Sequence, residues 1–342
     1  MNKKRWIAVL IAAGLFIISL LSAGLTSNLQ EEKQVSGLNS LLYGKDELSQ
    51  KILEEGNSTD KIVKLSVDGT ITSGGSTGLF ATEGYNHEKF MEQLNAIKED
   101  KSIKGIFLEV NSPGGGVYES AEIAKTLSDI RKDRHMSMYV SMKNTAASGG
   151  YYISAQADKI YVTEETVTGS IGVIMSGLNY SGLLKKLGIE DTTVKSGALK
   201  DIGSSTRPQT QADQSVLQAY IDNAYNRFVK VVSEGRHQSE EEVKKIADGR
   251  IYDGEQAKEV GLVDEIGYPQ DALRAMRKEQ KLENAQLVEY TTTSTGFANT
   301  WLGSKLAQLQ GLQATETNQI LTFLENQGTA ESPKAMYYYG GE

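Results

Sequence analysis

The sequence contains no cysteine among its 342 residues. This absence excludes disulfide bonds, thiolate nucleophiles and metal sites with cysteine ligands. Histidine is nearly as scarce, with three residues in the whole chain. A basic excess is also missing, because the net charge is −8 and the isoelectric point is about 5.2. We therefore do not expect a nucleic acid as a partner.

Charged residues are absent from one long run, Trp6–Leu25, which follows the basic residues Lys3, Lys4 and Arg5. A helix of about 20 residues spans about 30 Å, the thickness of the hydrocarbon core of a membrane. The small residues at 22–24 would also permit cleavage as a signal peptide, but the apolar run is long for one. We expect an uncleaved single-pass anchor in the cell membrane, with the N-terminus cytoplasmic and the rest of the chain extracellular.

The remaining sequence alternates between strand and helix patterns until the middle of the chain and is mainly helical after Pro208. Alternation of this kind predicts an α/β fold with parallel strands, in which sites lie where strands end. Strand patterns occupy 61–69, 105–112, 136–140, 159–165 and 170–176, and helix patterns occupy 87–100, 119–133 and 211–235. We predict a cytoplasmic N-terminus (1–5), an anchor (6–25), a polar tether with some helix (26–58), a main folded domain (59–290) and a helical and flexible tail (291–342).

A glycine loop, Pro113 followed by Gly114, Gly115 and Gly116, ends one predicted strand. Glycines leave backbone amides open to close approach, so the loop can form an anion nest or an oxyanion hole. An ordinary strand-to-helix turn explains the same residues equally simply. No Gly-Lys-Ser/Thr follows, so the loop is not a phosphate-binding P-loop.

Ser148 stands between two alanines and the pair Gly149 and Gly150, where a helix begins. Small neighbours let a substrate backbone reach the hydroxyl, and the amide of Gly149 can stabilise a developing oxyanion. The simpler interpretation is a serine that caps the helix.

A nucleophilic serine needs a base. The histidines His87, His135 and His237 lie in polar stretches typical of the surface, so we expect none of them to serve. A lysine can act instead if burial among neutral groups removes its proton. Lys200 is the best candidate because it stands in a Gly/Ala/Ser/Thr-rich segment.

Three other residues affect whether Lys200 can serve as the base. Asp201 would keep an adjacent amine charged unless it points to the opposite face. Lys195 is the rival base, but it lies in a strand-like run. Ser170, in a small-residue turn, could orient the amine or could simply be a turn serine.

Several segments in this order, VNSPGGG, NTAASGGYYISAQADKIY, TGSIGVI, SGALKDIGSSTRP and DGRIYDGEQAKEVGLVDEIG, resemble the signal peptide peptidase A (protease IV) family of Ser/Lys membrane peptidases. The resemblance covers roughly 61–267. It implies a Clp-protease/crotonase-like αβ superhelix and a serine endopeptidase that uses no cofactor and no metal. Ser148 would be the nucleophile, Lys200 the base and Ser170 a support for the lysine, with an oxyanion hole from Gly149 and either Gly114 or Gly115.

The resemblance also implies an assembly, because the chain carries one repeat where longer members carry two. Lys200 would then come from a neighbouring copy in a closed ring of eight, and the substrates would be signal peptides left in the membrane after export. Clp proteases place a histidine about two dozen residues after the serine, and the stretch at 169–177 holds none. That difference favours a Ser/Lys enzyme.

Two other functions remain open on the same fold, a crotonase-type acyl-CoA enzyme and a non-catalytic membrane scaffold. One further hypothesis concerns the tail, SPKAMYYYGGE, whose aromatic residues are unusual for a disordered end. We expect that it either docks in a substrate groove as an internal competitor or is unstructured.

Overall fold

The computed structural model describes residues 46–73, 84–294 and 334–340, and the statements below concern these residues. Most of them belong to one compact unit. The anchor predicted at 6–25 lies outside the described residues. Within the described part, no helix has both the length and the hydropathy needed to cross a bilayer.

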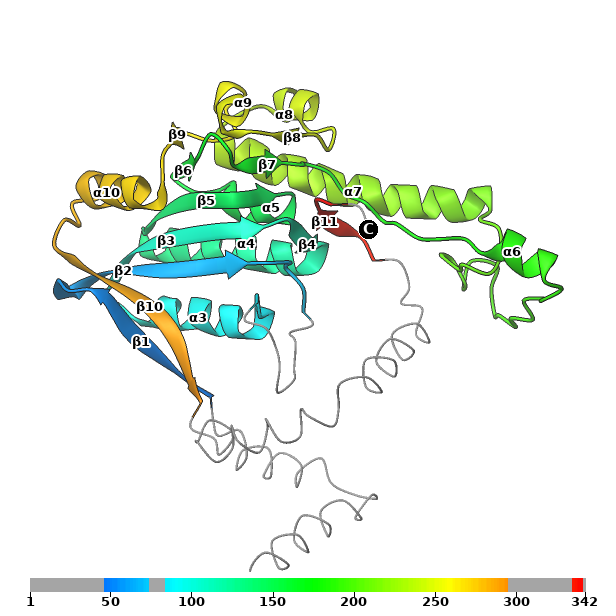
Figure 1. Ribbon diagram of the computed structural model, residues 1–342, viewed down its shortest axis with the longest axis horizontal. Helices are drawn as coiled ribbons and strands as arrows, with labels where there is room; N and C mark the ends of the chain where they lie inside the picture. The colour runs from blue at the N-terminus through cyan, green and yellow to red at the C-terminus, as the bar shows by residue number, and fades with distance from the viewer. Residues whose placement is uncertain (1–45, 74–83, 295–333, 341–342) are drawn as a thin grey trace, which may run out of the picture. The chain divides into compact units, whose positions relative to one another are not determined.

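A nine-stranded sheet forms the centre of the described residues, and its main path runs β1-β10-β2-β3-β5-β6-β9 (Figure 1). The pairs from β10 to β9 along this path are parallel, as the alternation of strands and helices predicted. β7 pairs in parallel with the end of β5 and antiparallel with β8, while β4 and β11 form a separate two-stranded sheet. The strands are β1 (Asp46–Glu54), β2 (Asn57–Asp68), β3 (Ile103–Ser112), β4 (Gly114–Gly116), β5 (Ser137–Ala147), β6 (Lys159–Val162), β7 (Val167–Gly169), β8 (Ile251–Tyr252), β9 (Glu265–Ile266), β10 (Ala285–Ser294) and β11 (Met336–Tyr338).

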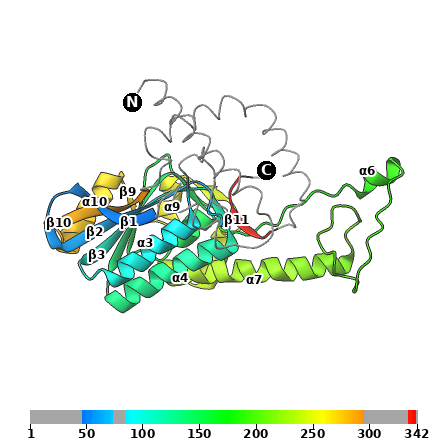
Figure 2. The ribbon, with the colours of Figure 1, turned by 90° about the horizontal axis from the view of Figure 1, so that it is seen from below.

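The helices of the described residues are α3 (His87–Glu99), α4 (Val117–Arg134), α5 (Gly149–Ser154), α6 (Ser181–Lys186), α7 (Gln211–Arg236), α8 (Glu240–Ile246), α9 (Gly254–Glu259) and α10 (Pro269–Glu279). Helices cover both faces of the sheet, whereas α6 lies beyond it (Figures 1 and 2). Capping boxes at Thr210 and Ser239 fix the starts of α7 and α8. The helices α3, α4 and α7 confirm the predictions at 87–100, 119–133 and 211–235.

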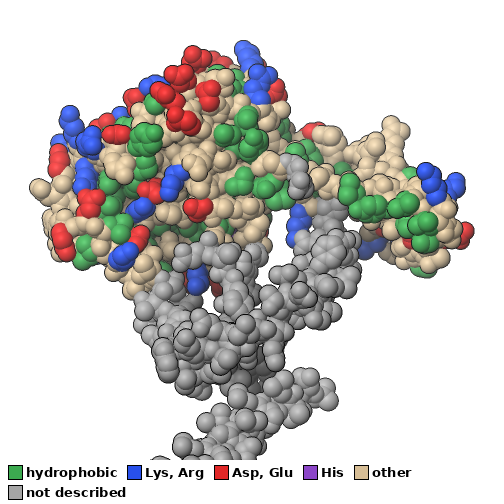
Figure 3. All heavy atoms as spheres, in the orientation of Figure 1, with side chains coloured by type: hydrophobic (Ala, Val, Ile, Leu, Met, Phe, Trp, Pro, Cys, Tyr) green, Lys and Arg blue, Asp and Glu red, His purple; other side chains and the backbone are tan. Residues whose placement is uncertain are grey.

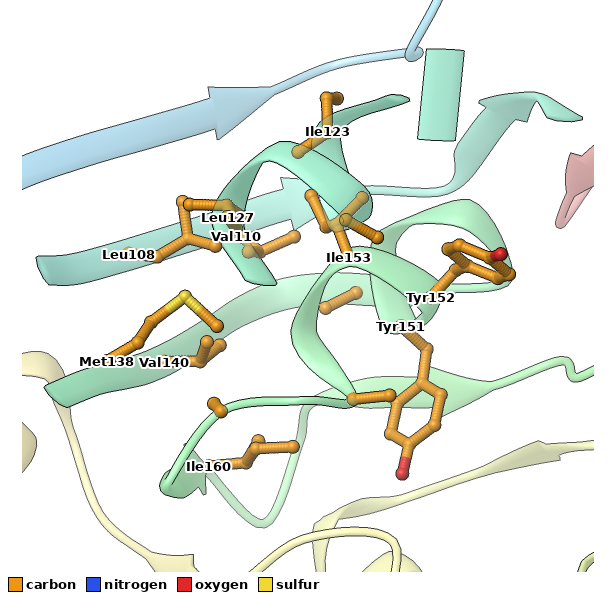
Figure 4. Packing of buried hydrophobic residues seen from close by; sticks show 14 of the residues in the cluster. Leu108, Val110, Ile123, Leu127, Met138, Val140, Tyr151, Tyr152, Ile153 and Ile160 are labelled. Carbon is orange, nitrogen blue, oxygen red and sulfur yellow. The ribbon is translucent and has the colours of Figure 1, made fainter. Parts of the chain in front are cut away.

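Side chains alternate between the two faces along each central strand, because successive residues of a strand point in opposite directions. Leu108 on β3 and Val140 on β5 belong to the larger core cluster, which α3, α4, α5 and α7 cover. Their neighbours Phe107 and Tyr139 belong to the smaller cluster under α10. Figure 4 shows Ile153 of α5 packed over the larger cluster, close to the end of β5. The sheet therefore holds the ends of β3 and β5 rigidly side by side.

Three sequence predictions of local structure are wrong. Residues 46–54 of the expected tether form β1, and residues 170–176 form only an isolated bridge at Ile174 instead of a strand. The strand-like run around Lys195 has no strand structure and is exposed. β1 pairs with β10, and Ile174 pairs with Met336, both far away in the sequence. Whether a segment finds such a distant partner leaves no signal in its own sequence.

Candidate active site

Ser148 directly follows β5 and precedes α5, in a conformation that non-glycine residues rarely adopt, with φ 51° and ψ −114°. Its amide donates to the Gly169 carbonyl at 2.8 Å, and its carbonyl accepts from the Tyr152 amide at 2.8 Å. The side chain makes no capping hydrogen bond to α5 and is only 1% exposed. The hydroxyl is therefore not the helix cap that the simpler interpretation required.

The amides of the glycine loop differ in what they bind. The Gly114 amide donates to Ser112 Oγ at 3.1 Å, and the Gly116 amide donates to the Ile71 carbonyl at 2.8 Å. A β-carbon built on Gly149 would lie 3.0 Å from the Gly115 amide nitrogen. The backbones of Gly115 and Gly149 thus approach each other closely beside Ser148. A side chain on Gly149 would obstruct this contact, and a β-carbon on Gly115 would collide with the Ile71 carbonyl oxygen at 1.9 Å.

Ser170 follows the last residue of β7 and lies close to Ser148, because the two strands β5 and β7 pair at this point. It directly follows Gly169, whose carbonyl binds the Ser148 amide, and it is 7% exposed. Its own φ is 50°, and its amide donates to the Arg250 carbonyl at 2.8 Å. The structure therefore brings Ser148, Gly149, Gly115 and Ser170 together from β5, α5, β4 and the end of β7.

Lys200 is not part of that group in the single chain. It is exposed and belongs to residues 176–210, which carry α6 and which we call the arm. In Figures 1 and 2 the part of the arm around and after α6 lies beyond the sheet, at the N-terminal end of α7 and away from α5. One copy of the chain thus presents the proposed nucleophile and the proposed base at separate places.

The carboxylate of Asp201, the neighbour of Lys200, is fully engaged elsewhere. Arg207 donates two hydrogen bonds to it at 2.9 Å, and Lys195 contacts it at 2.7 Å. Hydrogen bonds from Arg207 and then Lys195 hold the pKa of Asp201 well below its usual range. Lys195, the rival base, is itself committed to this ion pair.

The histidines differ from one another more than their sequence contexts indicated. His135 and His237 are exposed, as expected. His87 is buried at 8% exposure, with Nδ1 2.5 Å from the Tyr85 hydroxyl and Nε2 2.8 Å from Glu122. The prediction of a surface position for His87 was wrong because Glu122, its partner, lies 35 positions away on α4.

The C-terminal tail lies against the glycine loop as β11, antiparallel to β4, with Tyr337 paired to Gly115. On its other side Met336 and Ile174 exchange two backbone hydrogen bonds of 2.9 and 3.1 Å. The Tyr337 carbonyl oxygen would lie 3.0 Å from a β-carbon on Gly149. An extended peptide thus occupies the space between β4 and Ile174, with one carbonyl beside the clustered amides.

The side chain of Tyr337 fills a closed aromatic pocket. Its ring is fully buried, stacks on Tyr152 at a centroid distance of 4.9 Å and contacts Phe228 at 4.7 Å. Its hydroxyl donates to the Ala224 carbonyl at 2.9 Å. Sequence reasoning missed this pocket, because its walls come from α5 and α7, more than 70 positions apart.

In the described residues, no three His, Asp or Glu side chains lie close enough together to hold a metal ion. The site consists instead of a buried serine hydroxyl, convergent backbone amides and an extended peptide strand. Such an arrangement suits acyl transfer at a peptide carbonyl.

Comparison with known proteins agrees with this chemistry. Residues 130–283 match the model of peptidase family S49, and residues 80–168 match the model of Clp protease. A protein of Enterococcus faecium that is provisionally named signal peptide peptidase SppA is 54% identical over 344 residues, covering 100% of both chains. Protease 4 of Haemophilus influenzae is 31% identical over 84% of this chain and 48% of its own length. A solved ClpP1 mutant from Listeria monocytogenes aligns with a TM-score of 0.40 at 19% identity, covering 61% of this chain and 94% of that chain.

Proposed function

Because this chain belongs to peptidase family S49, it is a serine peptidase, and we propose that Ser148 is its nucleophile and Lys200 its general base. Its substrates are remnant signal peptides, as the name of the Enterococcus faecium relative suggests. The acyl-CoA and scaffold alternatives gain no support from these relatives.

In the proposed mechanism the neutral amine of Lys200 takes the proton of Ser148 Oγ, and Oγ attacks the scissile carbonyl. The amides of Gly149 and Gly115 stabilise the oxyanion. Of the two glycines that the sequence left open, Gly115 is favoured because the Gly114 amide already donates to Ser112 Oγ. Collapse of the intermediate breaks the C–N bond, and the protonated Lys200 gives its proton to the leaving amine. The neutral Lys200 then takes a proton from the water that attacks the acyl-enzyme, and the second intermediate collapses to release the acid and the Ser148 hydroxyl.

Ser170 supports the lysine in this proposal. It is buried beside the backbone of Ser148 and could accept a hydrogen bond from the incoming amine. Such a bond would fix the direction of the amine without adding a second charge.

The lysine comes from a neighbouring copy. Lys200 sits on the arm, which exposes many large apolar side chains, and such surfaces on soluble domains usually mark interfaces. Figure 3 shows apolar side chains gathered on the part of the arm near α6. These residues are Leu178, Tyr180, Leu183, Leu187, Ile189, Val194 and Leu199, with Val194 98% exposed. We propose a closed head-to-tail ring of eight copies on the αβ superhelix, in which covering the arm also removes water from Lys200.

The substrate binds as an extended strand on β4, in the place that β11 occupies. Main-chain pairing with β4 gives affinity independent of sequence, and the pocket of Tyr152 and Phe228 selects an apolar or aromatic side chain. Residues 6–25 anchor the ring to the membrane, with the catalytic part outside the cell. Signal peptides left in the bilayer are then within reach.

The observation that carries the proposal is a buried serine, Ser148, that makes no capping hydrogen bond and directly precedes the close approach of the Gly149 and Gly115 backbones, with a peptide strand along the same loop. Mixing protomers tests it. Full-length Ser148→Ala and Lys200→Ala rings should each be inactive on a fluorogenic peptide derived from a signal sequence. Dissociating and reassembling the two together should restore a fraction of wild-type turnover, because some interfaces then pair an intact serine with an intact lysine.

Failure of the mixture to recover would remove the shared site, provided that reassembled wild-type rings regain activity in parallel. Activity in Lys200→Ala alone would remove the lysine base. Lys195→Ala is the matched control: it should retain the dyad, although its loosened arm can lower turnover.

A further inference from the structure

Ser120 is a buried hydroxyl with no evident structural use. It lies one turn into α4, is fully buried, and its Oγ has no hydrogen-bond partner among the described residues. Buried polar side chains are nearly always paired, since an unpaired one loses its hydrogen bonds to water without replacement. An exception in a native structure therefore calls for an explanation.

The hydroxyl faces the clustered amides. A β-carbon on Gly149 would lie 2.6 Å from Ser120 Oγ, 3.0 Å from the Gly115 amide nitrogen and 3.0 Å from the Tyr337 carbonyl oxygen. Three polar atoms from α4, β4 and β11 therefore surround the same small space, which the bare Cα of Gly149 leaves open. One of the three is a peptide carbonyl oxygen in the groove.

We propose that Ser120 is a third hydrogen-bond donor of the oxyanion hole. The inference rests on the proposed role of Ser148 as nucleophile. Its hydroxyl lacks a partner in the resting structure and rotates to donate when the scissile carbonyl oxygen becomes an oxyanion. The proton stays on Ser120, and the hydrogen bond forms only in the tetrahedral intermediate and the transition state that leads to it. Such a donor stabilises the transition state more than the bound substrate and so raises kcat.

The same chain offers a matched control. Ser141 on β5 is also fully buried and its Oγ also lacks a partner in the described part of the chain. It precedes Ser148 by seven positions on an extended strand, which places it about 23 Å away at roughly 3.3 Å per residue. Ser141 thus shares the burial of Ser120 but not its place beside the amides.

The test compares Ser120→Ala with Ser141→Ala in the full-length protein. Both variants should match or exceed the melting temperature of the wild type, because each removes an unpaired buried hydroxyl. Ser120→Ala alone should lower kcat by about 10- to 100-fold with little change in KM, somewhat less than the loss of a main oxyanion donor. It should weaken inhibition by a substrate-matched peptide aldehyde, which forms a hemiacetal oxyanion with the serine, by a similar factor.

A Ser120→Ala enzyme with kcat within about twofold of wild type overturns the proposal. So does a lower melting temperature accompanied by equal effects on kcat and aldehyde binding in Ser141→Ala, because that result assigns both hydroxyls to packing. The Ser148→Ala variant distinguishes failure of the proposed nucleophile from failure of the proposed third donor. If it is inactive while Ser120→Ala is normal, only the third donor fails; if it retains activity, the nucleophile fails as well.

Discussion

Ser148 and Ser170 share an unusual backbone, with φ values of 51° and 50°. Left-handed conformations are strained for residues with a β-carbon and persist only where the surroundings hold them. Two backbone hydrogen bonds stabilise these conformations: the Ser148 amide donates to the Gly169 carbonyl, and the Ser170 amide donates to the Arg250 carbonyl. The unusual conformation of Ser148 marks the point where β5 ends and α5 begins, so the residue is held between the strand and the helix without capping that helix.

Gly149 is the residue at which the space for an oxyanion is most easily lost. An alanine there would bring its β-carbon to 2.6 Å from Ser120 Oγ and 3.0 Å from the Gly115 amide. We expect Gly149→Ala to lower kcat by about 100-fold or more and to destabilise the fold by about 1–3 kcal/mol through overpacking. Turnover assays and chemical denaturation measure the two effects, and a fully active Gly149→Ala enzyme would contradict this account.

At the scale of elements, β11 bears on regulation because it occupies the groove in which we propose that substrate binds. A truncation after Ser332 removes the strand and should lower KM for a peptide substrate by about tenfold, since an attached competitor has a high local concentration. The same truncation should lower the melting temperature, because it removes the buried ring of Tyr337. Steady-state kinetics and calorimetry report the two changes.

The control for this prediction is a truncation after Tyr339, which leaves β11 intact and should leave KM unchanged. An unaltered KM in the longer truncation would show that the tail does not compete with substrate.

Some of these elements could be predicted from the sequence alone, and others could not. The helices α3, α4 and α7 were predictable because periodicity and caps are local signals, and so were Ser148 and the glycine loop as candidates, because small residues cluster at strand ends. The pairing of β11 with β4 was not, since it joins residues more than 200 positions apart. The approach of Ser120 to Gly149 likewise depends on how α4 packs on α5. The contact between Lys200 and Ser148 remains a prediction, because one chain does not bring them together.

At the scale of the whole molecule, a charge network connects the arm to the start of α7. Arg207 bridges Asp201 at 2.9 Å and Asp213 at 2.6 Å, and Asp213 closes the capping box of α7 with Thr210. Lys195 binds Asp201 from within the arm at 2.7 Å. Because the arm carries Lys200 and many exposed apolar side chains, its shape should decide both assembly and catalysis.

This network should make the assembly sensitive to acid. Hydrogen bonds from Arg207 hold the pKa values of Asp201 and Asp213 below their usual range. Their stabilising contribution is complete above the ordinary carboxyl pKa of about 3.9 and is lost as the pH falls below it through the lowered values in the folded protein. We therefore expect rings to dissociate and turnover to cease on a brief shift to about pH 2–3, with recovery on return to neutral pH. Arg207→Gln should produce smaller particles and low activity already at pH 7.

Native mass spectrometry and light scattering measure the assembly, and a peptide assay measures turnover at the low pH and again after neutralisation. Arg274→Gln, which breaks an exposed ion pair of 3.4 Å with Asp271, is the matched control and should assemble normally, as surface pairs contribute little. If Arg207→Gln rings remain intact and fully active at pH 7, the network does not shape the arm for its neighbour. If they remain intact but inactive, the network acts on the placement of Lys200 alone, because assembly and catalysis would then depend on different parts of the arm.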